Sequence, residues 1–259
     1  MTHAPLLLLV FGVLIGITTV LFGFGGGFVV VPVIYGIAID RPDAMHVAVA
    51  TSTAVMVVNA SLATLSSRSS GLIRREYIWP LAGFIAVDAA VGALAAAHAS
   101  ESLIRALFVV YVMVTIVDSV ARRGFLDLSG EPRPLGRRVM SVGGVGIGAT
   151  AAFLGVGGSV MTVPLLRRRH LPMAAAAAMA NPLSIPIAVV GTLVYALPTD
   201  RASSGTLGYI DLAVGGTLLA ASLPAIAVTR RLVRHVPDRL HAVGYVALLV
   251  VTLLSMLAV

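Results

Sequence analysis

The sequence predicts an all-α polytopic membrane protein made of two inverted repeats, each a glycine-broken helical hairpin followed by three transmembrane helices. Three observations predict it. Of 259 residues, 58% are hydrophobic and 11% are charged, and the mean hydropathy is +1.00. A glycine-proline motif occurs once in each half, and the apolar segments have the lengths of membrane spans. No soluble domain of this size could keep such a composition in water.

The glycine-proline motif reveals an internal duplication. It reads Gly-Phe-Gly-Gly-Gly-Phe-Val-Val-Val-Pro from position 23 and Gly-Val-Gly-Gly-Ser-Val-Met-Thr-Val-Pro from position 155, a shift of 132 residues. Two upstream glycines, Gly12 and Gly16, recur as Gly144 and Gly148 and are expected to allow close helix packing. Consecutive glycines do not belong inside a helix, so the motifs predict two helix breaks. Paired breaks of this kind point to a transporter's binding site.

Ten apolar segments follow one another along the chain. They cover residues 5–22, 27–39, 44–66, 77–98, 102–121, 139–154, 159–166, 172–197, 208–229 and 239–257. Six of them, three in each half, are long enough to cross a hydrocarbon core of roughly 30 Å. The other four flank the glycines. One helix over 5–39 would be about 52 Å long, too long for a bilayer, so a broken hairpin is expected instead.

The arginines decide how these segments cross the membrane. All the positive charge behind the net +7 is arginine, since the chain contains no lysine. If each broken segment crosses once, the eighteen arginines divide nine and nine, which contradicts the positive-inside rule. If each returns to the side it came from, only Arg41, Arg105 and Arg201 lie on one face. This second model predicts both termini outside a plasma or inner cell membrane, and it inverts the second half relative to the first.

The same model divides the chain into three parts. Residues 1–121 form the first transmembrane repeat and residues 139–259 the second. Residues 122–138, which include Pro132 and Pro134, form a cytoplasmic linker loop.

The second arm of each hairpin begins directly after the glycines, where a helix N-terminus presents unpaired N–H groups and the positive end of its dipole. Such an end binds anions. Two tips that enter from opposite faces would meet near the midplane. The candidate substrate-binding residues at the tips are Gly25, Gly26, Gly27, Gly157, Gly158 and Ser159.

The segment after each hairpin carries polar groups at a corresponding depth. With Pro42 set against Pro172, Thr51 and Ser52 correspond to Asn181 and Pro182, and these four complete the predicted site. Hydroxyl and amide donors without a nearby cation could select a small oxyanion and still release it. The alternative for each hydroxyl is a hydrogen bond to its own helix.

Two titratable residues also stand out. Asp88 lies near the middle of the 77–98 segment, where an unpaired carboxylate is costly, and proton coupling is the functional hypothesis for it. A structural hydrogen bond to a neighbouring helix is the equal alternative. His46 opens the 44–66 segment and could titrate near neutral pH, but a solvated histidine at the interface is the expected case.

Other classes of protein have little support. The chain has no cysteine, and no metal-ligand spacing or catalytic set emerges, so neither an enzyme nor a cofactor or metal site is expected. Short arginine clusters between apolar runs are typical of cytoplasmic loops, not of a nucleic-acid surface. The expected partners are a small anion, the lipid bilayer and, through Asp88, protons. Assembly as a homo-oligomer is compatible with the sequence.

The duplicated motif, the polar patch early in the next helix and the arginine-rich central loop resemble the sulfite exporter TauE/SafE family. The resemblance spans essentially the whole chain and implies a carrier of small sulfur-containing or organic anions, such as sulfite or sulfonates. It assigns the family's core to the ten site residues named above, with Ser159 where the first motif has Gly27. The resulting prediction is an exporter that works by alternating access. An anion channel, a proton-coupled uptake permease and a non-transporting scaffold are the alternatives.

Overall fold

A computed structural model describes residues 4–121, 124–126, 131–132, 137–197, 205–231 and 236–258. The first half of the chain contains helices α1 (Ala4–Phe22), α2 (Gly27–Ile37), α3 (Ala44–Ser67), η1 (Arg68–Ser70), α4 (Arg75–Ile78), α5 (Leu81–His98) and α6 (Glu101–Ala121). The second half contains α7 (Arg137–Leu154), α8 (Ser159–Arg167), α9 (Met173–Tyr195), strands β1 (Thr206–Leu207) and β2 (Ile210–Asp211), α10 (Leu212–Thr229) and α11 (Asp238–Ala258).

Six helical segments of the described chain are long and apolar enough to cross a membrane, three in each half. They are Ala44–Ser67, Arg75–His98, Glu101–Ala121, Met173–Tyr195, Leu212–Thr229 and Asp238–Ala258. The prediction of a helical polytopic membrane protein is therefore confirmed. One small departure is the antiparallel pairing of β1 with β2, just before α10.

Both glycine motifs interrupt helices at matching positions. Helix α1 ends at Phe22 and α7 at Leu154, while α2 begins at Gly27 and α8 at Ser159, so the ends agree with the shift of 132 residues. Glycines with positive φ occupy both breaks: Gly23, Gly25 and Gly26 in the first, and Gly155 and Gly157 in the second. An L side chain adopts this backbone region only at a cost, which explains why glycines gather there.

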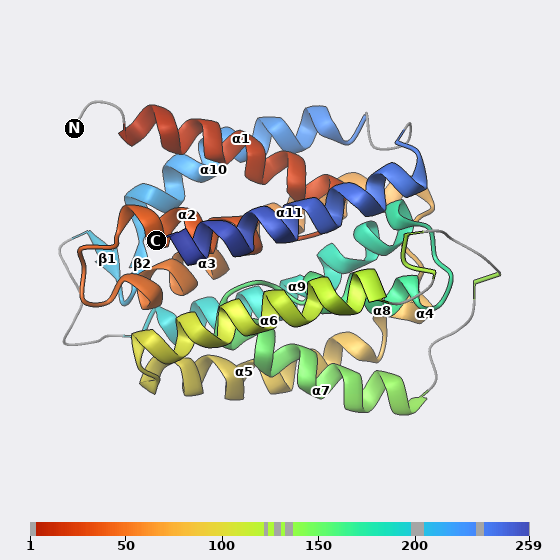
Figure 1. Cartoon of the computed structure of the whole chain (residues 1–259), viewed down its shortest axis with the longest axis horizontal. Coiled ribbons are helices and arrows are strands. Elements are labelled where there is room, and N and C mark those ends of the chain that lie inside the picture. Colours follow the sequence, from red (N-terminus) through yellow and green to blue (C-terminus); the bar gives the residue numbers. More distant parts are fainter. Residues whose placement is uncertain are drawn as a thin grey trace.

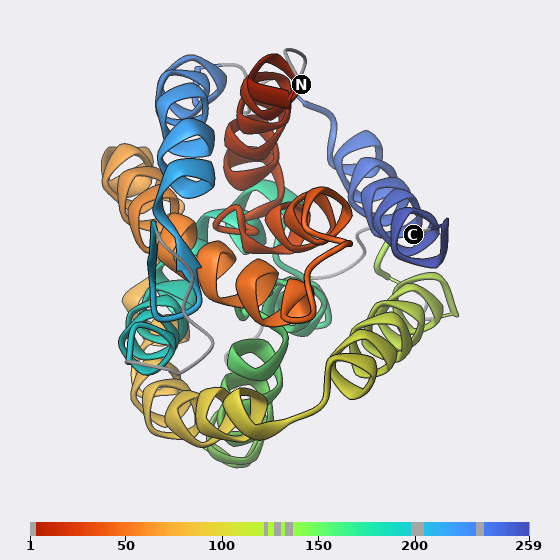
Figure 2. The same cartoon turned by 90° about the vertical axis from the view of Figure 1, so that its left-hand side faces the viewer.

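Corresponding helices of the two halves pack against corresponding partners. Helices α3 and α9 contact each other in the centre, α1 packs on α10, and α7 packs on α5. Each short arm lies on the helix that follows it, α2 on α3 and α8 on α9. Figure 2 shows α2 near the middle of the bundle, and α3 and α9 are the most buried of the six spans.

The outer glycines make close packing possible. A Cβ atom added at Gly12 would lie 2.7 Å from that of Ala221 on α10, and Gly16 and Gly148 face the backbones of α10 and α5 as closely. These three glycines confirm the expected packing role. The packing of Gly144 is not among the contacts that the structure describes.

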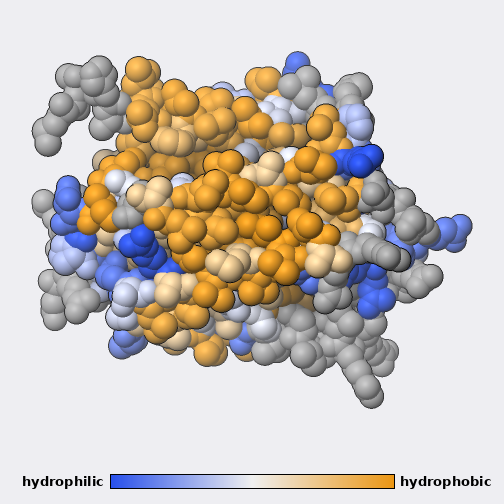
Figure 3. Space-filling model, in the orientation of Figure 1, coloured by the Kyte–Doolittle hydropathy of each residue, from blue (hydrophilic) through white to orange (hydrophobic). Residues whose placement is uncertain are grey.

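The surface and the chain ends fit a bilayer. Figure 3 shows an apolar belt with hydrophilic residues at both ends of the long axis. Large exposed apolar side chains on α1, α6 and α11, such as Leu6, Val114 and Val251, contribute to this apolar surface. Figure 1 shows that α1 begins and α11 ends at the left-hand end, whereas α7 begins at the right-hand end. Most of the predicted linker 122–138 lies outside the described residues, and the division into two repeats stays a prediction.

Candidate functional site

The two glycine breaks lie against each other inside the molecule. A Cβ atom added at Gly27 would lie 2.7 Å from the carbonyl oxygen of Gly155. One added at Gly157 would lie 3.5 Å from the carbonyl oxygen of Phe24. Only glycine permits this approach, because a side chain at either position would have to displace backbone or neighbouring side chains. Segments 132 residues apart thus form one buried junction.

Met56 of α3 lies between the two breaks. A Cβ at Gly25 would meet its Cγ at 2.8 Å, and one at Gly157 would meet its Sδ at 2.6 Å. Its thioether is flexible and polarizable, so it can follow changes in the spacing of the breaks. Met56 could not be identified from the sequence, since a methionine in an apolar helix carries no distinguishing signal.

Each central helix holds the break of the other half. Ser52 of α3 donates a hydrogen bond at 2.7 Å to the carbonyl oxygen of Gly155 in the second break, with the Val49 carbonyl as a competing acceptor at 2.8 Å. The amide nitrogen of Asn181 on α9 donates at 3.2 Å to the carbonyl of Thr19, one turn before the first break. These contacts bring Ser52 and Asn181, two of the predicted site residues, to the junction.

Several buried polar atoms near the junction have no hydrogen-bond partner among the described residues. They are the hydroxyls of Ser159 and Thr162, the side-chain nitrogen of Asn59 and the side-chain oxygen of Asn181. Each such group costs about 1–3 kcal/mol when it stays unpaired. In addition, no described side chain caps the N-termini of α2 or α8. The junction therefore holds donors from Ser159, Thr162 and Asn59, and one acceptor from Asn181, that no described residue satisfies.

Asn59 belongs to the first break, although the predicted site did not include it. Its amide nitrogen lies 2.9 Å from the position of a Cβ at Gly26, and its oxygen accepts a hydrogen bond at 2.9 Å from Ser222 of α10. The helical period indicates Asn59 from the sequence, because this residue lies seven residues after Ser52 and so on the same face of α3. Ser222 had no comparable signal.

The two breaks are not equivalent in detail. Gly26 has φ of +92°, whereas its counterpart Gly158 has φ of −71°. Gly158 packs on Ile187, whose Cδ1 would lie 2.9 Å from an added Cβ. The second break thus leaves the left-handed region one residue earlier.

Three predicted residues lie apart from the hydrogen bonds at the junction. Thr51 accepts a hydrogen bond at 2.9 Å from the backbone N–H of Asp211 in β2, and its methyl group faces Gly215 of α10. Pro182 is half-buried within the continuous helix α9. Asp88 accepts a hydrogen bond at 2.9 Å from the backbone N–H of Ala149 on α7, which is the neighbouring-helix contact weighed as its structural alternative.

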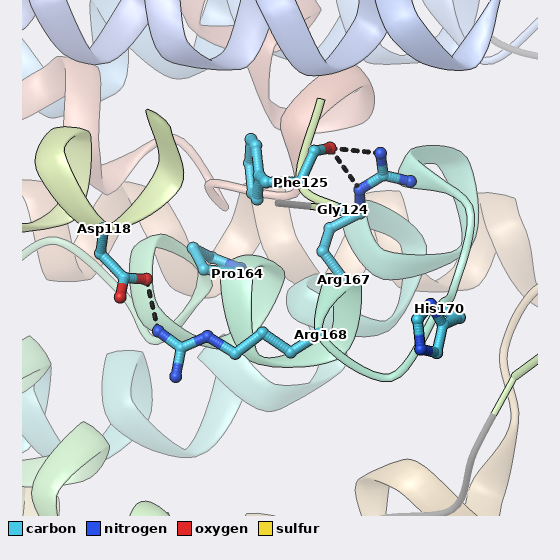
Figure 4. Close-up of a pocket in the computed structure, with 7 residues that line it drawn as sticks. All are labelled: Asp118, Gly124, Phe125, Pro164, Arg167, Arg168 and His170. Atoms are coloured by element: carbon cyan, nitrogen blue, oxygen red, sulfur yellow. Dashed lines mark hydrogen bonds and ion pairs between the residues drawn. The ribbon is translucent and has the colours of Figure 1, made fainter. Parts of the chain in front are cut away.

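An arginine-lined cavity opens between α6 and α8 (Figure 4). It measures about 340 Å³ and is lined by Asp118, Gly124, Phe125, Pro164, Arg167, Arg168 and His170. A second cavity of about 380 Å³ shares Asp118, Pro164 and Arg168 with it and reaches Val160 in the first turn of α8. The two cavities form one groove from the end of α8 to the edge of the second break.

The two arginines in this groove differ sharply. Arg167 is buried, and its guanidinium donates to the carbonyls of Phe125 and Leu171 and to the carboxylate of Asp238. Arg168 is exposed and pairs with Asp118 across the groove (Figure 4). Arg167 therefore stabilises the fold, whereas the guanidinium of Arg168 is exposed and could bind an anion in place of Asp118.

Six apolar spans around two contacting helix breaks, with unsatisfied donors at the junction, define a polytopic membrane transporter. The comparisons with known proteins agree. The family model "Sulfite exporter TauE/SafE" matches residues 8–256, and the chain belongs to this family. The "Probable membrane transporter protein" of Methanocaldococcus jannaschii is 24% identical over 240 residues, covering 86% of this chain and 82% of that protein. No solved structure matches the chain.

Proposed function

We propose that this transporter is a secondary carrier that exports a small anion, such as sulfite or an organosulfonate, through a site between the two glycine breaks. The observation that carries the proposal is the group of buried donors without protein partners at the junction, led by Ser159 and Asn59. Hydroxyl and amide groups are natural ligands of a small oxyanion. The family name points to the same class of substrate.

The helix ends strengthen this site. Helices α2 and α8 both begin at the junction, so their uncapped first turns direct N–H groups and positive dipole ends toward it. The polar side chains at the junction are neutral, and release of the anion is therefore not opposed by a buried ion pair. The groove past Arg168 supplies positive charge on the approach to Val160 and the second break.

Alternating access would follow from the repeats. The helix starts seen in Figure 1 support hairpins that enter from opposite faces with the repeats inverted, and the arginine distribution supports placing both termini outside the cell membrane. The crossed contacts of Ser52 and Asn181 support a rocking motion, because moving one repeat against the other changes the polar surroundings of both breaks. Export of an anion is helped by the inside-negative potential, worth about 2.3 kcal/mol per charge per 100 mV.

Ser159→Ala tests the site. The substitution removes a hydroxyl that has no partner among the described residues, so the ligand-free protein should be as stable as the wild type or more so. The increase in melting temperature caused by sulfite should be lost. Ser255→Ala is the matched control, because its hydroxyl donates to Thr252 of its own helix α11.

The measurement is a thermal-shift screen of the purified protein against sulfite, sulfate, thiosulfate, sulfonates and carboxylates, followed by counterflow in liposomes. Saturable counterflow separates a carrier from a channel. A Ser159→Ala variant that keeps the wild-type anion response would remove the breaks from the site. Absence of binding and flux with every anion would favour a scaffold.

A further inference from the structure

A carboxylate of α6 holds the N-terminus of the central helix α3. Glu101, the first residue of α6, accepts hydrogen bonds from the backbone N–H groups of Met45 at 2.5 Å and His46 at 3.3 Å. The same carboxylate contacts Nδ1 of the His46 ring. The His46 side chain is only 2% exposed, so the expectation of a solvated histidine is wrong. A role for a buried histidine beside a carboxylate therefore has to be found.

In the second half, a carboxylate likewise holds the N-terminus of the central helix, but its basic partner is an arginine. Asp238, the first residue of α11, accepts a hydrogen bond at 2.7 Å from the backbone N–H of Met173 at the start of α9. Its other oxygen binds Arg167 at 2.9 Å. Asp238 and Glu101 are both 31% exposed, while their cationic partners are buried. Arginine does not lose its proton in proteins, whereas histidine does, so only the first of the two pairs can exchange a proton.

The hydrogen-bond partners of the His46 ring favour an extra proton on the first pair. The Nε2 atom of His46 lies 3.1 Å from the carbonyl oxygen of Ala96, and Nδ1 faces the Glu101 carboxylate. Both ring nitrogens therefore face acceptors, but a neutral imidazole carries one N–H only. The missing donor is one extra proton, located either on Nδ1 or on the Glu101 oxygen. Without it, one ring nitrogen would turn its lone pair to an acceptor, either the Glu101 carboxylate or the Ala96 carbonyl.

This proton has a route to water. Glu101 lines a cavity of about 630 Å³ together with Tyr35, Ser102 and Arg105. The imidazole lies behind it, away from solvent. Glu101 can therefore take a proton from cavity water and share it with His46.

The other charged groups at this end of α3 are already engaged. Arg41 pairs with Asp43 at 3.0 Å, and the hydrogen bond from that carboxylate raises the pKa of Arg41. Asp211 accepts a hydrogen bond from Val214 N and so caps α10. Arg105 donates to the carbonyl of Met256 and lies over the ring of Tyr35. Each of these groups thus has hydrogen-bond or charge partners apart from His46 and Glu101.

The pair of His46 and Glu101 is linked both to Thr51 and to the two helix breaks. The His46 ring stacks on Tyr209 with 5.0 Å between ring centroids, and Asp211, two residues further on, bonds to Thr51 through its N–H. Helix α3 itself carries Ser52, Met56 and Asn59 to the breaks. A displacement of the N-terminus of α3 would therefore move these three side chains relative to the breaks.

We propose that the pair of His46 and Glu101 is the proton-binding site that couples proton movement to anion transport, in place of Asp88. The inference rests on the proposed carrier function. Loading adds one proton from cavity water and gives an imidazolium beside a carboxylate, with no net charge. Release returns that proton to water and leaves a net charge of −1, which repels an anion and sets a ring lone pair against an acceptor. Proton and anion therefore move in the same direction, so an inward proton gradient favours uptake, the alternative to export.

Liposomes containing the protein provide the first test. Methanesulfonate is the probe, since it stays a monoanion, whereas sulfite could cross the lipid as the neutral dioxide at acid pH. A gradient of one pH unit should drive its accumulation in the wild type, up to about tenfold for one proton per anion. Glu101→Gln and His46→Gln, which keep hydrogen-bonding groups, should retain counterflow and lose this accumulation. Asp88→Asn is the control and should retain both.

A second measurement does not depend on transport. Exchange of the imidazole C2 proton, followed by mass spectrometry, reports the charge of each histidine between about pH 5 and pH 8. Glu101→Gln should displace the profile of His46 and leave that of His98 unchanged, because the His98 ring contacts the carbonyl of Leu94 on its own helix. An unchanged His46 profile would overturn the proton site.

The outcomes separate the two proposals. Counterflow without any response to the pH gradient in the wild type overturns the coupling while the carrier function stands. Loss of accumulation in Asp88→Asn but not in Glu101→Gln assigns the proton to Asp88 and overturns the inference. No counterflow in the wild type with any anion overturns the carrier function and, with it, the coupling.

Discussion

The hydroxyl of Ser52 lies 2.7 Å from the carbonyl oxygen of Gly155, so a helix of the first half holds the broken backbone of the second. Asn181 makes the reciprocal contact to Thr19 at 3.2 Å. Neither break is supported by its own half alone. A shift of one half against the other must therefore exchange or break these hydrogen bonds, which is what a two-state carrier requires.

Ser52→Ala should weaken the second break. We expect the free energy of unfolding to fall by about 1 kcal/mol and the anion-induced thermal shift to shrink, because Gly155 loses its donor. Thr53→Val is the control, since the Thr53 hydroxyl donates to Ala50 of its own helix at 2.7 Å. Thermal unfolding in detergent, with and without sulfite, measures both effects. Equal effects of the two variants on the anion response would contradict the assignment.

Gly157→Ala should destabilise the protein and abolish counterflow. The residue has φ of +69°, a region that costs an L residue about 1–2 kcal/mol, and its Cβ would lie 2.6 Å from Met56 Sδ. Gly216→Ala on α10 should act in the opposite direction, since nothing lies within 4 Å of its added Cβ and alanine favours a helix by about 1 kcal/mol. Chemical denaturation of both variants provides the comparison. A Gly157→Ala protein as stable as the wild type would argue against a tight junction.

The periodic and duplicated features of this chain could be predicted from the sequence. Composition and segment length identify the six spans, and the consecutive glycines identify both helix breaks to within a residue of Gly27 and Ser159. These features follow from local rules: the bilayer sets the length, and glycine runs do not continue a helix. The matching depth of Ser52 and Asn181 likewise follows from the repeat.

Contacts between distant segments could not be predicted in the same way. Met56 and Ser222 reach the junction only through tertiary packing, and Thr51 is diverted from it by the N–H of Asp211, 160 residues away. The burial of His46 against Glu101 depends on how α6 returns beside α3. No pattern within either helix encodes these choices.

Arg167→Met and Arg168→Met should differ in stability although the residues are adjacent. Arg167 is buried and holds two backbone carbonyls and Asp238, so its loss should cost about 3 kcal/mol or more. Arg168 forms a solvent-exposed pair with Asp118, and its loss should cost less than about 1 kcal/mol. Differential scanning calorimetry compares them. Arg168→Met should still slow anion entry at low salt, and a flux equal to that of the wild type would remove Arg168 from the approach to the site.

Cysteines at the two ends of α6 test the proposed orientation directly. The chain has no native cysteine, and both Ser102 and Ala121 are exposed, so Ser102→Cys and Ala121→Cys each place one reactive thiol at a known end of one helix. An impermeant maleimide applied to intact cells should label Ser102→Cys, because that end lies on the proposed outer side with the chain termini. Ala121→Cys should react only after the membrane is permeabilised. The reverse pattern would contradict the proposed topology and place the pair of His46 and Glu101 on the cytoplasmic side.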